Sequence, residues 1–138
     1  MILVVEDSQD DAELTLHALR GSAGPVEVEV ARDGREALDI LLGGEAMRRN
    51  RKQPEIILLD LKLPKISGLE VLRTIKADPA TRRIPVIVFT SSGEPLDIER
   101  AYELGANSYV QKPVSFASLN DAIGRLRSYW LTLNVAAP

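Results

Sequence analysis

The sequence contains no cysteine, no long apolar run and no excess of positive charge. The absence of cysteine excludes disulfide bonds and thiolate chemistry and is compatible with a reducing compartment. No apolar run approaches the roughly 20 residues that a membrane-spanning helix needs. The apolar start meets acidic residues at once, unlike a secretory signal peptide. The net charge of −3 gives no basis for broad nucleic-acid binding. We therefore expect a cytoplasmic protein that binds neither membranes nor nucleic acids.

The 138 residues fit a single domain that is long enough to bury a substantial core. Neither end carries enough additional sequence for a second domain, so we expect one domain over residues 1–138. Within that domain we expect a folded core over residues 2–130 and a C-terminal extension over residues 131–138.

Apolar runs alternate with helical patterns along the chain. The apolar runs are typical of strands, and the segments between them have the spacing of amphipathic helices, with glycine or proline near their ends. Five strand–helix units in series predict an α/β fold whose parallel sheet is covered by helices on both faces. Residues 43–55 lack clear periodicity and are expected to be a partly helical insertion. The expected strands are 2–5, 26–31, 56–59, 85–89 and 108–110, and the expected helices are 11–20, 35–42, 69–77, 96–104 and 116–130.

Acidic residues follow the two most apolar of these strands. Glu6 and Asp7 follow the first strand, and Asp60 follows the third. The most apolar strands are expected to be central, and parallel strands end at one sheet edge, where ligands bind in folds of this type. We therefore expect the three carboxylates to converge on one point.

A cluster of bare carboxylates is unstable, because like charges a few ångströms apart repel one another. A cation among them would relieve this repulsion. Oxygen ligands without a nearby histidine or cysteine select a hard ion, and two or three carboxylates leave room for water and phosphate oxygens, which favours Mg²⁺ over Ca²⁺. The alternative is that the acids only cap the helices that follow them. Capping does not explain why both acidic strand ends belong to one sheet edge.

The fourth and fifth strands add a hydroxyl and an amine to the same edge. Thr90 follows the fourth strand, and Lys112 follows the fifth. Beside acids and a metal, these two groups could contact phosphoryl oxygens. Taken singly, Thr90 could be a helix cap and Lys112 an exposed loop amine. Their combination with the acids favours a site that handles phosphate.

Together these residues resemble the receiver domain of two-component response regulators. The resemblance covers nearly the whole chain and implies a flavodoxin-like, doubly wound (βα)5 fold with strand order 2-1-3-4-5. Glu6 departs from the more common aspartate, a change that keeps the charge and lengthens the arm. The residues that match the family pattern are Glu6, Asp7, Asp60, Pro64, Gly68, Thr90, Tyr109, Lys112 and Pro113.

The resemblance implies a phosphoacceptor and a metal site. Asp60 is expected to take a phosphoryl group from a phosphohistidine on a sensor histidine kinase. Mg²⁺ is expected to be held by Glu6, Asp7, Asp60 and the backbone carbonyl of Lys62, and to neutralise the approaching anions.

The resemblance also implies a switch. Lys112 and Thr90 are expected to hold the oxygens of the bound phosphoryl group, and movement of Thr90 would open space for Tyr109 to turn inward. The chain is then not an enzyme in the ordinary sense. It is expected to be a phosphoacceptor that catalyses its own phosphoryl transfer and autodephosphorylation.

Three alternatives remain open. A phosphohydrolase with an aspartyl nucleophile would usually carry a second aspartate two residues after Asp60, where this chain has Lys62. A flavodoxin-like cofactor binder would need a hydroxyl- and glycine-rich loop after the first strand, but residues 6–11 are largely acidic and would repel a phosphate. A receiver that acts only as a docking module would share the fold, although every active-site position is filled here.

The expected output of this domain is a contact with another protein. We expect a stand-alone response regulator that docks onto a target or passes its phosphoryl group to a histidine phosphotransfer protein. The insertion and the ending over residues 129–134 resemble, less specifically, single-domain regulators that pair with phytochrome-type sensor kinases.

The end of the sequence also predicts a homodimer. The helix at 116–130 has an apolar stripe that the core needs, and further apolar residues follow beyond what one small domain can cover. We expect the contact to use the helix at 96–104, the strand at 108–110, the helix at 116–130 and the tail. The alternative is that the tail folds back over its own sheet edge. The surplus apolar residues are Tyr129, Leu131, Leu133 and Val135.

Overall fold

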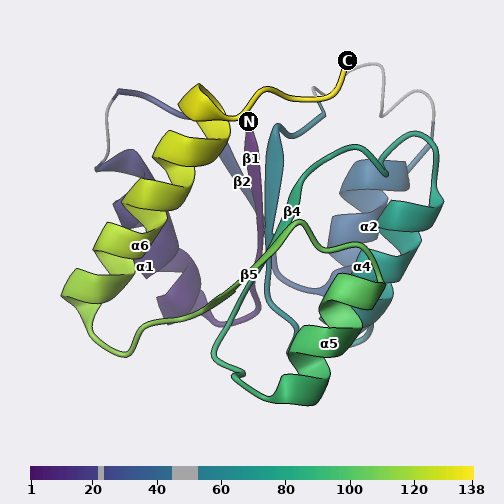
Figure 1. The fold of residues 1–138 in the computed structure, drawn as a ribbon, viewed down its shortest axis with the longest axis horizontal. Helices are drawn as coiled ribbons and strands as arrows, with labels where there is room; N and C mark the ends of the chain where they lie inside the picture. The colour runs from purple at the N-terminus through teal and green to yellow at the C-terminus, as the bar shows by residue number, and fades with distance from the viewer. Residues whose placement is uncertain (22–23, 45–52) are drawn as a thin grey trace.

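The protein forms one five-stranded parallel sheet in the order β2-β1-β3-β4-β5 (Figure 1). The computed structural model describes residues 1–21, 24–44 and 53–138. The fold class and strand order expected above are confirmed. The strands are β1 (Ile2–Val5), β2 (Val28–Ala31), β3 (Ile56–Leu59), β4 (Val86–Thr90) and β5 (Ser108–Gln111).

Helices cover both faces of the sheet (Figure 1). One face carries α1 and α6, and the other carries α2, α4 and α5. None of the described helices combines the length and apolar character needed to cross a membrane. The helices are α1 (Gln9–Arg20), α2 (Gly34–Leu42), α4 (Gly68–Ala77), α5 (Pro95–Glu103) and α6 (Phe116–Ser128).

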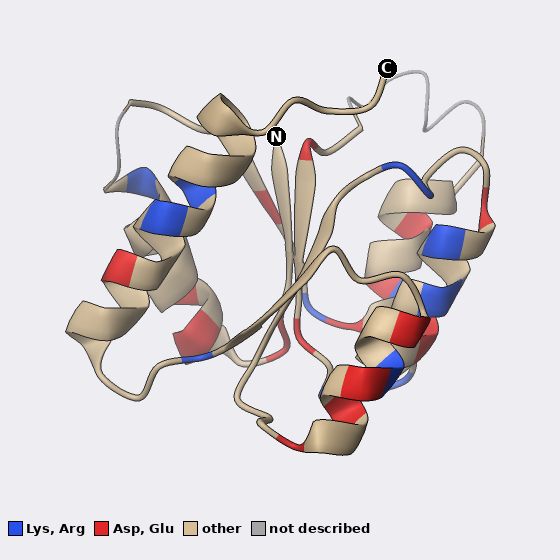
Figure 2. Ribbon diagram, in the orientation of Figure 1, with Lys and Arg blue, Asp and Glu red and all other residues tan. Residues whose placement is uncertain are grey.

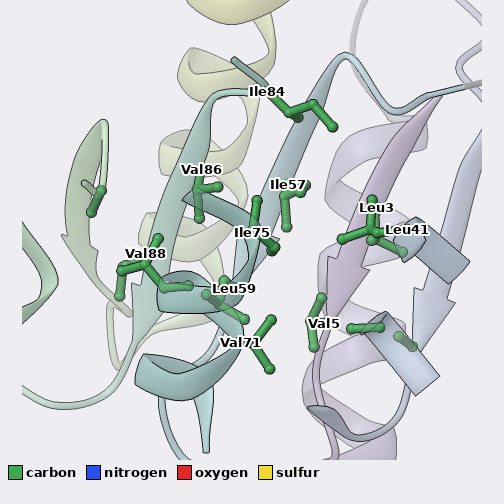
Figure 3. Packing of buried hydrophobic residues seen from close by; sticks show 14 of the residues in the cluster. Leu3, Val5, Leu41, Ile57, Leu59, Val71, Ile75, Ile84, Val86 and Val88 are labelled. Carbon is green, nitrogen blue, oxygen red and sulfur yellow. The ribbon is translucent and has the colours of Figure 1, made fainter. Parts of the chain in front are cut away.

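The central strands are apolar throughout because each of their faces contacts a separate core. Leu3 and Val5 of β1 belong to the core under α2, α4 and α5 (Figure 3). Ile2 and Val4 belong to the core under α1 and α6. Successive side chains of a strand point to opposite faces, so a continuous apolar run fills both cores.

The second strand is shorter than expected at its start. It begins at Val28 instead of residue 26, because its partner β1 begins at Ile2, which lies opposite Val28. The remaining strand and helix ends differ from the expectation by at most two residues. The expected partial helix within residues 43–55 falls mainly on residues 45–52, which lie outside the described residues.

The last helix ends earlier than expected and changes type. α6 ends at Ser128, and a π-helical turn follows over Tyr129–Leu133, closed by a hydrogen bond from the Asn134 N–H to the carbonyl of Tyr129 at 2.7 Å. Trp130 and Leu131 both pack against the core under α1 and α6. A wider turn shifts the helical register, which lets two consecutive residues face one core. Leu131 was expected among the surplus apolar residues, and that part of the prediction is wrong.

Candidate functional site

Three carboxylates meet at the carboxyl edge of the sheet. Glu6 and Asp7 follow β1, and Asp60 follows β3, in loops that Figure 2 shows as acidic segments at the lower edge of the sheet. Glu6 and Asp60 are buried, whereas Asp7 is exposed. One oxygen from each residue lies within 4.8 Å of the others, so the cluster could hold a metal ion. Each ligand is an oxygen, which suits a hard divalent cation.

Asp60 is held by hydrogen bonds to both of its carboxylate oxygens. Thr90 Oγ1 donates to Asp60 Oδ1 at 2.8 Å, and the backbone N–H of Lys62 donates to the same oxygen at 3.2 Å. Lys112 Nζ donates to Oδ2 at 3.2 Å. Burial alone would raise the pKa of Asp60, but the charge of Lys112 and these hydrogen bonds hold it below its usual value. The carboxylate is therefore ionised at neutral pH, as a nucleophile must be.

Lys112 lies among acidic side chains. Its ammonium contacts Glu6 and Asp60, and its side chain is 11% exposed. Burial alone would lower the pKa of Lys112, but the hydrogen bond to Glu6 and the charges of Asp60 and Glu6 raise it. Burial raises the pKa of Glu6 to about 7, assisted by the charge of Asp60 and opposed by Lys112. The ammonium thus compensates the charge of carboxylates that would otherwise repel one another.

Glycine at position 68 lets the loop after β3 close tightly behind Asp60. A Cβ atom on Gly68 would lie 2.2 Å from the carbonyl oxygen of Asp60 and 2.5 Å from Cα of Leu61. The Gly68 N–H donates to the carbonyl of Leu61 at 3.0 Å. Only glycine permits this approach of two backbone segments. Ser67 then caps α4 by accepting a hydrogen bond from the Glu70 N–H.

Thr90 and Tyr109 lie on neighbouring strands. Thr90 is fully buried and directed at Asp60. The Tyr109 ring packs against the core under α2, α4 and α5, and its hydroxyl donates to the carbonyl of Ser92 at 2.8 Å. Burial raises the pKa of Tyr109. Thr90 therefore contacts the acceptor, and the partly buried Tyr109 packs against the neighbouring core.

A further acid at the site, Asp11, was not predicted from the sequence. Asp11 lies in the first turn of α1, and its Oδ2 accepts a hydrogen bond from Lys112 Nζ at 3.1 Å. Ser8 caps this helix by accepting from the Asp11 N–H. The cap places Asp11 three residues into the helix, one turn beyond the acidic pair. The spacing from Asp7 could have indicated that Asp11 lies near the acidic pair. The sequence does not indicate that Lys112 lies close enough to contact it.

Comparison with known proteins places this geometry in a family. Residues 2–124 match the response regulator receiver domain. Over 134 residues the chain is 41% identical to the probable methanogenesis regulatory protein FilR2 of Methanothrix harundinacea, covering 97% of this chain and 85% of FilR2. Over 131 residues it is 39% identical to the response regulator Rcp1 of Synechocystis sp., covering 95% of this chain and 88% of Rcp1.

Solved structures agree with these sequence matches. The phosphorylated cyanobacterial phytochrome response regulator RcpA superimposes with a TM-score of 0.93 at 38% identity, over 99% of this chain and 97% of RcpA. The Mn²⁺-bound form of Rcp1 superimposes with a TM-score of 0.90 at 37% identity, over 99% of this chain and 98% of that structure. These relatives therefore match at least 95% of this chain in sequence and 99% of it in fold.

Proposed function

The chain belongs to the response regulator receiver family, and we propose that Asp60 is the residue on which it accepts a phosphoryl group from a sensor histidine kinase. The observation that carries this proposal is the hydrogen-bonded position of Asp60 between Thr90 and Lys112, beside the acids that follow β1. The chain is homologous to phytochrome response regulators. A role as a phosphoacceptor in two-component signalling follows from that family.

The transfer needs one nucleophile and several groups that stabilise charge. An oxygen of Asp60 attacks phosphorus, the bond between phosphorus and the histidine nitrogen breaks, and the electron pair stays on the imidazole, which takes up a proton. Lys112 and Thr90 then stabilise the phosphoryl oxygens by charge and hydrogen bonding. Both groups already contact Asp60, so little reorganisation is needed.

We propose that Mg²⁺ is the ion held by Glu6, Asp7, Asp60 and the backbone carbonyl of Lys62. The all-oxygen donor set suits it, and the related Rcp1 binds the similar ion Mn²⁺. When bound, Mg²⁺ supplies charge neutralisation for the reacting anions. Without a cation, the acidic cluster would repel the phosphoryl group.

Two of the three alternative functions are less well supported by the site. The position two residues after Asp60, where a phosphohydrolase would need its general acid, holds the exposed Lys62, which contributes a backbone N–H instead. A docking module without phosphorylation would not need Asp60, Thr90 and Lys112 in mutual contact. We propose that the chain catalyses its own phosphorylation and autodephosphorylation and signals through Thr90 and Tyr109, without being an enzyme for another substrate.

We propose that the phosphodonor is a phytochrome-type sensor histidine kinase, since RcpA is a phytochrome response regulator. Purified histidine kinases loaded with radioactive phosphate should be compared for their initial rates of transfer to the chain. We expect the phytochrome-type kinase to transfer fastest, and we expect the label to pass onward if a histidine phosphotransfer protein is supplied. Equal or faster transfer from kinases without a phytochrome would contradict the assignment.

We also propose that the protein is a homodimer through α5, β5, α6 and the tail. A shallow groove of about 450 Å³ lies between β5 and α6, bordered by Val110, Leu126, Tyr129 and Trp130. Tyr129 at its border is 49% exposed, and Leu133 and Val135, which follow in the tail, are 71% and 91% exposed. Part of the tail does fold back on its own domain, since Arg83 donates to the carbonyl of Pro138 at 2.7 Å. The exposed residues would be covered by a second copy.

Removing the exposed apolar residues should therefore weaken the dimer without unfolding the domain. The double variant Leu133→Ser and Val135→Ser should shift sedimentation from dimer to monomer at tens of micromolar protein. Val114→Ser is the control, because Val114 is also a highly exposed apolar residue but lies in the loop between β5 and α6. A monomeric unmodified chain, phosphorylated or not, would overturn the proposal. So would a double variant that dimerises as well as the control.

A further inference from the structure

Asp11 contacts the ammonium of Lys112 and is the most exposed of the three carboxylates that do so. Its side chain is 47% exposed, whereas those of Glu6 and Asp60, which share the same ammonium, are 4% and 9% exposed. Glu6 and Asp60 occupy the positions that the family pattern assigns to the metal and the phosphoacceptor. Asp11 is an additional carboxylate, outside that pattern, between Lys112 and bulk water.

Asp11 and Lys112 line the same pocket. The pocket has a volume of about 230 Å³ and lies between the start of α1 and the segment that joins β5 to α6. Asp11 is the one acidic side chain among the described residues that line it, and Lys112 is the one basic side chain. The other lining residues are Leu14, Thr15, Pro113, Val114, Ser115, Phe116 and Leu119. A small anion that enters this pocket meets the carboxylate of Asp11 at the ammonium that should receive it.

We propose that Asp11 determines phosphodonor specificity: acting through Lys112, it disfavours strongly anionic small phosphodonors relative to less anionic ones. The inference rests on the proposed role of Asp60 as phosphoacceptor. Asp11 is a positioning residue, because it contacts the lysine and not the acceptor.

Two effects of the Asp11 carboxylate act in the same direction. It repels the incoming anion, and it competes with the phosphoryl oxygens for the hydrogen bonds of Lys112. A partly exposed charge a few ångströms from the reacting group changes a rate by roughly three- to tenfold, and salt reduces the change.

Acetyl phosphate and phosphoramidate are two small phosphodonors that differ in net charge, so comparing them tests the effect of donor charge. Acetyl phosphate is a dianion at neutral pH. Phosphoramidate carries a protonated nitrogen and has less net negative charge. In both reactions an oxygen of Asp60 forms a bond to phosphorus. The bond to acetate oxygen or to ammonia nitrogen breaks, and the leaving group keeps the electron pair. Asp11 should therefore lower the rate of phosphorylation by acetyl phosphate and have little effect on the rate with phosphoramidate.

The test measures the rate of phosphorylation by each donor, with Mg²⁺, by intact-protein mass spectrometry. The proteins are the unmodified chain, Asp11→Asn, Asp11→Glu and Asp10→Asn. Asp10 is the matched control. It lies beside Asp11 in the first turn of α1, but it is not among the residues that line the pocket, and the ion pair with Lys112 is made by Asp11. We expect Asp11→Asn to raise the ratio of the acetyl phosphate rate to the phosphoramidate rate about three- to tenfold at low salt, and less at high salt.

The other two variants should keep the rate ratio of the unmodified chain. Asp11→Glu retains the negative charge at position 11, and Asp10→Asn removes a negative charge that is not paired with Lys112. An unchanged ratio in Asp11→Asn would overturn the inference, and so would an equal change in Asp10→Asn or a change that salt does not reduce. A merely structural role for Asp11 would alter both rates together and leave the ratio fixed. If the unmodified chain took no label from either donor, the proposed phosphoacceptor function itself would fail.

Discussion

Replacing Asp60 by asparagine is expected to reduce phosphorylation by acetyl phosphate and Mg²⁺ to background. The unmodified chain should gain one phosphoryl group that is stable in acid and labile in base, as an acyl phosphate is. The Asp60→Asn variant retains an oxygen that can accept hydrogen bonds from Thr90 and from the Lys62 N–H. It lacks the ionised oxygen that attacks phosphorus. Intact-protein mass spectrometry measures the added mass directly.

The fold should survive this substitution. Lys112 keeps its contacts with Glu6 and Asp11, so the variant still has a paired ammonium. Asp121→Asn is a matched control, because Asp121 is exposed on α6 and forms only a loose contact of 3.8 Å with Arg125. The control should be labelled like the unmodified chain, and both variants should unfold cooperatively on heating. Undiminished labelling of Asp60→Asn would disprove the assignment of the acceptor.

Replacing Lys112 by alanine is expected to separate phosphoryl transfer from metal binding. The rate of phosphorylation should fall by roughly a hundredfold or more, the typical effect of losing a group that stabilises charge in a transition state. The affinity for Mg²⁺ should stay the same or rise, because an ammonium that contacts Glu6 and Asp60 is removed from the acids. Isothermal titration calorimetry measures the affinity, and mass spectrometry measures the rate.

The comparison variant is Asp7→Ala, which removes an exposed carboxylate of the proposed metal site and leaves the side chain of Asp60 unchanged. It should weaken Mg²⁺ binding clearly. A Lys112→Met variant keeps most of the side-chain length and reports whether lost packing contributes to the result. If Lys112→Ala lowered the Mg²⁺ affinity as much as Asp7→Ala, the proposed division of labour would be wrong.

The sheet was predictable because its signals are local in sequence. β1 and β3 are uninterrupted apolar runs, and an apolar run that fills cores on both faces is typical of a central parallel strand. The acids that end these two strands had to meet, because parallel neighbours end at one edge. The strand order, in contrast, came from the resemblance to receiver domains and not from periodicity.

The features that the sequence did not predict depend on contacts between distant parts of the chain. Asp11 contacts Lys112, which lies 101 positions later in the chain, and nothing in the first turn of α1 indicates that contact. The π-helical turn at Tyr129–Leu133 keeps Trp130 and Leu131 on one core, whereas helical spacing alone predicted Leu131 to be exposed. The start of β2 was limited by the length of its partner strand.

The central claim is tested most directly by locating the phosphoryl group. Borohydride reduces an aspartyl phosphate to homoserine, and tandem mass spectrometry of the digested protein then identifies the modified position. After incubation with acetyl phosphate and Mg²⁺, homoserine should be found at position 60 and nowhere else, and it should be absent when Mg²⁺ is removed by a chelator. Homoserine at Asp7, at Asp11 or at any other aspartate in place of Asp60 would contradict the account.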